Sequence, residues 1–193
     1  MINSISVGAR QKMLTLKKST QGTFMVEFAI VGVAFGLVLA FCSDIVVQMP
    51  VKGKLDRMSF SGVSLIKERT QLFDDSNFTI TKSEFDKSDR ILQNSLQRTM
   101  SNFDSNKYGS LLEVQTYQTN SAMSAKPLIT HRGGVLTCSP PDALDTSLAV
   151  VTSWGRKTTL YRLTLCYDTE NWFGDLIGKD YKRVSSTSLM VGR

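Results

Sequence analysis

The residue types that carry most enzyme chemistry are sparse in this chain of 193 residues. It has a single histidine, His131, and three cysteines, Cys42, Cys138 and Cys166. A thiol with a nearby imidazole can act as a nucleophile with its base, and Cys138 follows His131 by seven residues. Such a pair on a Gly- and Pro-containing loop is a common coincidence, and a disulfide would consume the thiol. We therefore expect no catalytic residue and no enzyme activity.

Metal and cofactor sites are not expected either. One histidine and no closely spaced pair of cysteines do not make a recognisable ligand set for a metal ion. The chain also has no glycine-rich loop followed by the lysine that cradles phosphates. The sequence thus gives no indication of a bound cofactor.

Glu27 is the one acid in an unusual place, because it begins an apolar stretch. Residues 28–43 contain no charged side chain, and with their flanks they are long enough to cross a bilayer. A carboxylate within a membrane segment is costly and tends to have a partner. Gly22 lies five positions before Glu27. A cut after Gly22 would free an α-ammonium group on Thr23, which could pair with the Glu27 carboxylate of a neighbouring subunit.

The charge distribution predicts how the apolar stretch is oriented. The net charge is +6, and residues 1–22 contribute four basic side chains and no acid. Basic residues just before a span stay in the cytoplasm. We therefore expect a basic cytoplasmic leader over 1–22, a transmembrane helix over 23–49 and the larger C-terminal part outside. Because the folded part carries little basic excess, no nucleic-acid partner is expected. Asp44, at the outer edge, is expected to reach water.

After the span, apolar residues recur at helical intervals. The helix is therefore expected to continue past Pro50 as an amphipathic extension over 50–73. The positions that define the stripe are Val51, Leu55, Met58, Gly62, Leu65, Arg69 and Leu72. A second helix is expected from Ser83, with Ser83 as its cap.

The second half of the chain has the composition of β-strands. Strand-like segments rich in Val, Thr, Leu and Tyr are expected at 112–116, 148–153, 158–167 and 181–191. A turn at 154–157 is expected to join two of them as a hairpin. Trp154, Trp172 and Phe173 are expected to pack against the core or neighbouring loops. Helices followed by short strands indicate an α+β fold with a mostly antiparallel sheet, in a domain over 74–193.

Two cysteines lie in this expected exported domain. In an oxidising compartment Cys138 and Cys166 are the natural disulfide pair, and the alternative is that both are buried thiols. Cys42 is expected to be held apart from them by the bilayer.

The segment Gly22-Thr-Phe-Met-Val-Glu27-Phe28 resembles the prepilin signature that an aspartyl prepilin peptidase cleaves on the cytoplasmic side. Its form is that of the tight-adherence (Tad/Flp) pilins, with Phe28 in the place of their tyrosine. Residues 53–61 and 66–73 and the ending Ser-Leu-Met-Val-Gly-Arg193 are similar to TadF-like minor pilins. The resemblance implies a pilin-like fold and processing at Gly22, Thr23, Glu27 and Phe28.

The same resemblance implies a function and a set of partners. TadF-like proteins are pseudopilins of a bacterial pilus assembly machinery that supports adhesion and biofilm formation. The chain would then sit in the inner membrane with its domain in the periplasm, or enter the pilus. The implied partners are the prepilin peptidase, other minor pilins, the major pilin and the pilus assembly platform.

Two other interpretations stay open. The chain could be a signal-anchored periplasmic binding or sensing module whose leader is never cut. It could also be a lipoprotein cleaved before Cys42, because Leu39-Ala40-Phe41-Cys42 resembles a lipobox, although Phe41 stands where a small residue is usual.

Overall fold

A computed structural model of the chain describes residues 21–68, 80–118 and 123–192. Predictions that concern only residues 1–20 or 69–79 lie outside the described residues, among them the basic leader and the end of the amphipathic extension. The chain divides into two compact units, Met1–Leu39 and Ala40–Arg193.

One long helix, α1, runs from Gln21 to Lys67 and contains Pro50 in its interior. Proline removes one backbone hydrogen bond, which bends a helix without necessarily ending it. The expected continuation of the apolar helix into an amphipathic one is confirmed. In the second unit, α1 buries Leu55, Val63 and Ile66.

The next described helix, α3, spans Lys82–Thr99 and is capped by Thr81. The Thr81 hydroxyl accepts from the Glu84 N–H, and the Glu84 carboxylate accepts from the Thr81 N–H at 2.7 Å. This reciprocal arrangement is a capping box, which satisfies two backbone donors at once. The prediction that Ser83 is the cap was wrong. Thr81 is followed three residues later by Glu84, whose longer side chain can reach back to the Thr81 N–H and complete the box.

In the described residues, four strands form one antiparallel sheet. They are β1 (Tyr108–Gln115), β2 (Ile129–Gly134), β3 (Leu160–Asp168) and β4 (Arg183–Val191), in the order β2-β1-β3-β4. Leu163 of β3 lies opposite Leu112 of β1 and Ser188 of β4, so β3 and β1 form the centre of the sheet. The α+β prediction with an antiparallel sheet is confirmed.

Two details of the predicted strands were wrong. Residues 148–153 do not form a strand: the short helix η2 (Thr146–Leu148) is followed by a single bridge between Val151 and Lys157. Conversely, β2 was not among the predicted strands. A Cβ atom on Gly133 would come within 2.5 Å of an Asp89 carboxylate oxygen, so glycine is needed where α3 approaches the strand.

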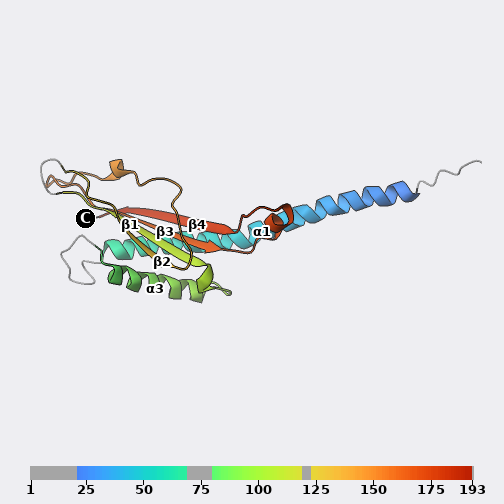
Figure 1. The fold of residues 1–193 in the computed structure, drawn as a ribbon, viewed down its shortest axis with the longest axis horizontal. Helices are drawn as coiled ribbons and strands as arrows, with labels where there is room; N and C mark the ends of the chain where they lie inside the picture. Colours follow the sequence, from blue (N-terminus) through green and yellow to red (C-terminus); the bar gives the residue numbers. More distant parts are fainter. Residues whose placement is uncertain (1–20, 69–79, 119–122, 193) are drawn as a thin grey trace, which may run out of the picture. The chain divides into compact units, whose positions relative to one another are not determined.

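Within the second unit, α1 and α3 lie along the same face of the sheet (Figure 1). A Cβ atom on Gly62 of α1 would meet Leu163 of β3 at 2.6 Å and Leu92 of α3 at 3.0 Å, so the three elements are closely packed there. The core between helices and sheet contains Leu55, Val63, Ile66, Ile80, Phe85, Leu92, Leu96, Met100, Tyr108, Leu112, Val114, Tyr161, Leu163, Leu165, Tyr167 and Val184. A second cluster contains Leu111 of β1 and Cys166 of β3, which alternate with the residues of the first core, and Cys138 from the loop after β2.

Candidate functional site

The histidine and the cysteine that could have formed a nucleophilic pair have other partners. The His131 ring, on β2, bonds the Ile80 carbonyl oxygen through Nε2 at 2.8 Å and stacks on Phe85 of α3. Cys138 is buried and joined to Cys166 in a disulfide, with the two Cα atoms 5.8 Å apart. The predicted disulfide is confirmed, and no thiol remains at Cys138 for His131 to activate.

No metal site is found in the part of the chain that the structure describes. Across residues 21–68, 80–118 and 123–192, no three His, Cys, Asp or Glu side chains come together as a possible ligand set. Cys42 is a free, exposed cysteine on α1.

The buried acid Asp89 has a structural role. Its carboxylate accepts hydrogen bonds from the Tyr108 hydroxyl at 2.8 Å, the Ser110 hydroxyl at 2.6 Å and the Gln93 side-chain amide at 2.8 Å. These donors satisfy the charge where α3 meets β1. Burial first, and then the neighbouring Asp89 carboxylate, raise the pKa of Tyr108 well above its ordinary value.

The residues of the predicted processing signature begin α1. Gly22 and Thr23 lie in its first turn, and Glu27 and Phe28 follow on the same helix, both exposed. The helix thus presents this signature and the apolar span as one continuous element.

One helix of the described residues is long and apolar enough to cross a membrane. In the first unit its large apolar side chains are exposed, which in water would be strongly unfavourable. They are Phe24, Met25, Val26, Phe28, Ile30, Val31, Val33, Phe35, Leu37, Val38 and Leu39. A surface of this kind has to be covered by lipid or by other apolar helices.

Asp44 was expected to reach water, and this prediction was wrong. Its side chain is buried, with 9% of the residue exposed, and its carboxylate accepts from the backbone N–H groups of Trp172 at 3.1 Å and Phe173 at 2.8 Å. These two residues open the short helix α4 (Trp172–Ile177), in which the preceding Asn171 makes no side-chain cap. Asp44 therefore takes the place of the missing cap and ties α4 to α1.

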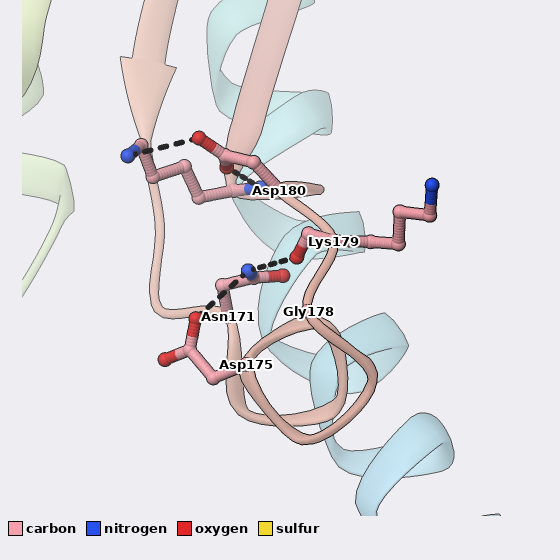
Figure 2. Close-up of a pocket in the computed structure, with 6 residues that line it drawn as sticks. Asn171, Asp175, Gly178, Lys179 and Asp180 are labelled. Atoms are coloured by element: carbon pink, nitrogen blue, oxygen red, sulfur yellow. Dashed lines mark hydrogen bonds and ion pairs between the residues drawn. The ribbon is translucent and has the colours of Figure 1, made fainter.

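The turn after α4 folds back on Asn171, as Figure 2 shows. The Asn171 side-chain amide donates to the Lys179 carbonyl oxygen at 2.8 Å and to the Asp175 carboxylate at 3.2 Å. Lys182 pairs with Asp180 at 3.1 Å. These residues line an open pocket together with Gly178. These hydrogen bonds and this ion pair stabilise the turn. Because the Asn171 amide and the two carboxylates are engaged within the loop, the pocket has no evident chemistry of its own.

Little in the local sequence predicts α4. Six residues are too few to display a helical period. The left-handed Gly178, with φ of 68°, ends the helix and is the one local signal that could have predicted it. Trp154 and Trp172 were expected to pack against the core or neighbouring loops, and they are instead 87% and 61% exposed. Phe173, for which the same was expected, packs edge-on against Phe41.

Comparison with protein families identifies the chain's family. The profile of the family described as "Putative tight adherence pilin protein F" (TadF) matches residues 15–193, nearly the whole chain. No curated protein and no solved structure matches the chain.

Proposed function

Because the chain belongs to the TadF family of tight adherence pilin proteins, we propose that it is a minor pilin, or pseudopilin, of a tight adherence (Flp type) pilus. In this role it helps to assemble the pilus and so supports adhesion and biofilm formation. Pilin families are generally structural rather than catalytic. The driving energy for assembly then comes from other components of the machinery.

The observation that carries the proposal is the start of α1. Gly22, Glu27 and Phe28 open a helix whose large apolar side chains are exposed from Phe24 to Leu39. The helix continues into the second unit (Ala40–Arg193, the folded unit). A peptidase that cuts after Gly22 leaves Thr23 with an α-ammonium group. In an array of such helices this group pairs with the exposed Glu27 carboxylate of a neighbour, which removes the cost of an unpaired acid in the membrane.

The distribution of charge and of cysteines supports the proposed location. The basic leader favours a cytoplasmic N-terminus. The folded unit holds a buried disulfide between Cys138 and Cys166, which is typical of an oxidising compartment such as the periplasm. We therefore assign the folded unit to the periplasmic side of the inner membrane.

Complementation with a matched pair of glycine variants tests the proposal. A host strain that lacks this chain is expected to lose pili and surface attachment, and the full chain to restore both. Gly22→Val should block cleavage and fail to restore them. Gly32→Val is the control, because it makes the same change in the span where a Cβ atom meets nothing within 4 Å.

Other outcomes point to the alternatives. If the Gly22→Val variant stays uncut and still restores attachment as well as the wild type does, the chain acts as a signal-anchored module. If lipid is attached to Cys42 and the label is lost in Cys42→Ser, the chain is a lipoprotein. Either result rejects the proposed processing.

A further inference from the structure

A short segment of the folded unit exposes an apolar surface beside α1. We call residues 172–181, which contain α4 and the turn after it, the α4 elbow. Trp172 and Leu176 lie four residues apart on one side of α4 and are 61% and 65% exposed. Ile177 and Tyr181 are exposed as well. Large side chains gathered in this way mark a contact with another apolar phase.

The α4 elbow is fixed to α1 by three contacts. Asp44 accepts the two N–H groups that open α4. The Phe173 ring packs against the Phe41 ring, with centroids 5.2 Å apart. The Gln48 side-chain amide donates to the Tyr181 carbonyl oxygen at 3.0 Å. Together they hold the elbow against residues 41–48 of the helix.

The length of the apolar run places these contacts at the far edge of the membrane. An α-helix rises about 1.5 Å per residue, so the 20 residues from Phe24 to Ser43 cover about 30 Å, the thickness of the hydrocarbon core. Asp44 is the next residue and the first charge after Glu27. A segment bonded to Asp44 therefore lies at the level where hydrocarbon gives way to lipid headgroups.

We propose that the α4 elbow inserts into the outer interface of the membrane that α1 crosses, with its exposed side chains in contact with phospholipid. Trp and Tyr are enriched at this level because their rings are apolar and their edges are polar, which suits Trp172 and Tyr181. Leu176 and Ile177 enter the boundary of the acyl chains. The proposal rests on the part of the proposed function that puts α1 across the membrane.

One cation of the elbow suits a phospholipid surface. Lys179 extends away from the turn (Figure 2), where its ammonium group can reach a lipid phosphate. Of the two acids in the elbow, Asp180 pairs with Lys182, whereas the exposed Asp175 accepts from the Asn171 amide, which is neutral. The elbow therefore presents the Lys179 ammonium group and apolar side chains together, with Asp175 also exposed. It fixes the depth of the folded unit at the membrane.

The two tryptophans of the chain provide an internal comparison. Trp172 lies in the elbow, and Trp154 lies in the turn between Val151 and Lys157, in the connection between η2 and β3. The full chain is reconstituted into vesicles of phosphatidylethanolamine and phosphatidylglycerol, as Trp154→Phe, which leaves Trp172, and as Trp172→Phe, which leaves Trp154. The fluorescence emission of the remaining tryptophan is then measured with brominated lipids and with aqueous iodide as quenchers.

The expected result is that Trp172 loses most of its emission in brominated lipids, more for bromine near the headgroup than near the chain end, and resists iodide. Trp154 should show the opposite pattern. If Trp172 is quenched by iodide as strongly as Trp154 and unaffected by brominated lipid, the inference is overturned. Shielding of Trp172 that appears only when another pilin is added would also overturn it, in favour of a protein partner.

The same vesicles separate this inference from the proposed function. If alkaline carbonate extracts the chain from the vesicles, α1 does not anchor it and the proposed function fails with the inference. If the chain stays in the membrane and Trp172 remains open to iodide, only the inference fails.

Discussion

The carboxylate of Asp44 accepts a hydrogen bond from the backbone N–H of Phe173 at 2.8 Å, although 129 positions separate the two residues in the chain. This bond, with its companion to Trp172, connects the end of the apolar part of α1 to the loop between β3 and β4. From the sequence, Asp44 is expected to lie in water at the edge of the membrane. In the structure its carboxylate instead holds α4 in place.

Replacing Asp44 with alanine should release α4. Two backbone N–H groups would lose a charged acceptor in a largely buried place, and the expected loss of stability is about 1–3 kcal/mol. Urea unfolding in detergent micelles measures this loss. Hydrogen exchange should show faster exchange at the amides of Trp172 and Phe173, with the amides of β1 unchanged.

The control for Asp44→Ala is Asp86→Ala. Asp86 pairs with Lys82 on the surface of α3, and about half of each side chain is exposed. A pair of this kind contributes less than about 1 kcal/mol. Equal losses in the two variants, or unchanged exchange at Trp172, would show that Asp44 does not anchor α4.

The disulfide should contribute more to stability than any single hydrogen bond. Cys138 and Cys166 are 28 positions apart, and closing a loop of this length stabilises the folded state by about 3–4 kcal/mol in the chain-entropy description. Peptide mapping without reductant should recover the two cysteines joined. The double change to serine should lower the free energy of unfolding by that amount, whereas Cys42→Ser should leave it unchanged. Two free thiols at positions 138 and 166 would contradict this account.

Tyr108 should make the folded unit sensitive to alkaline pH. Its pKa in the folded state is raised well above the ordinary value, first by burial and then by Asp89. The folded state therefore keeps the proton at pH values where the unfolded chain has lost it. The stability that depends on this group is fully present below a pH of about 10 and is lost as the pH rises toward the folded-state pKa.

Tyr108→Phe tests this linkage. At neutral pH the variant should be less stable by about 1 kcal/mol, since it loses the hydrogen bond to Asp89. The difference between wild type and variant should shrink as the pH rises above about 10. Denaturant unfolding at a series of pH values measures this difference in the free energy of unfolding. A difference that stays constant across that range would contradict the raised pKa.

Periodic features of the sequence were enough to predict the framework of the fold. The helical spacing that begins at Val51 predicted that α1 continues past Pro50, and the Val- and Tyr-rich segments predicted β3 and β4 within a few residues. Such patterns arise from burying one face of an element, so they can be recognised without knowledge of its partner.

Features decided by a partner from elsewhere in the chain were not predicted. Gly133 looks like a strand break until Asp89 of α3 is placed against it. Asp44 looks exposed until the N–H groups of α4 are placed beside it. Trp154 was assigned to the interior or to loop packing because of its residue type alone. In each case the outcome depends on a tertiary neighbour, which local propensity does not contain.

We propose above that the leader is removed after Gly22, so that the mature chain and its long helix begin at Thr23. The most direct test is the intact mass and N-terminal peptide of the protein purified from its own host with an active prepilin peptidase. We predict a chain that begins at Thr23 with a free α-amino group, and an uncut chain in the Gly22→Val variant. A wild-type protein that still carries residues 1–22, or one that begins at Cys42, would contradict the account.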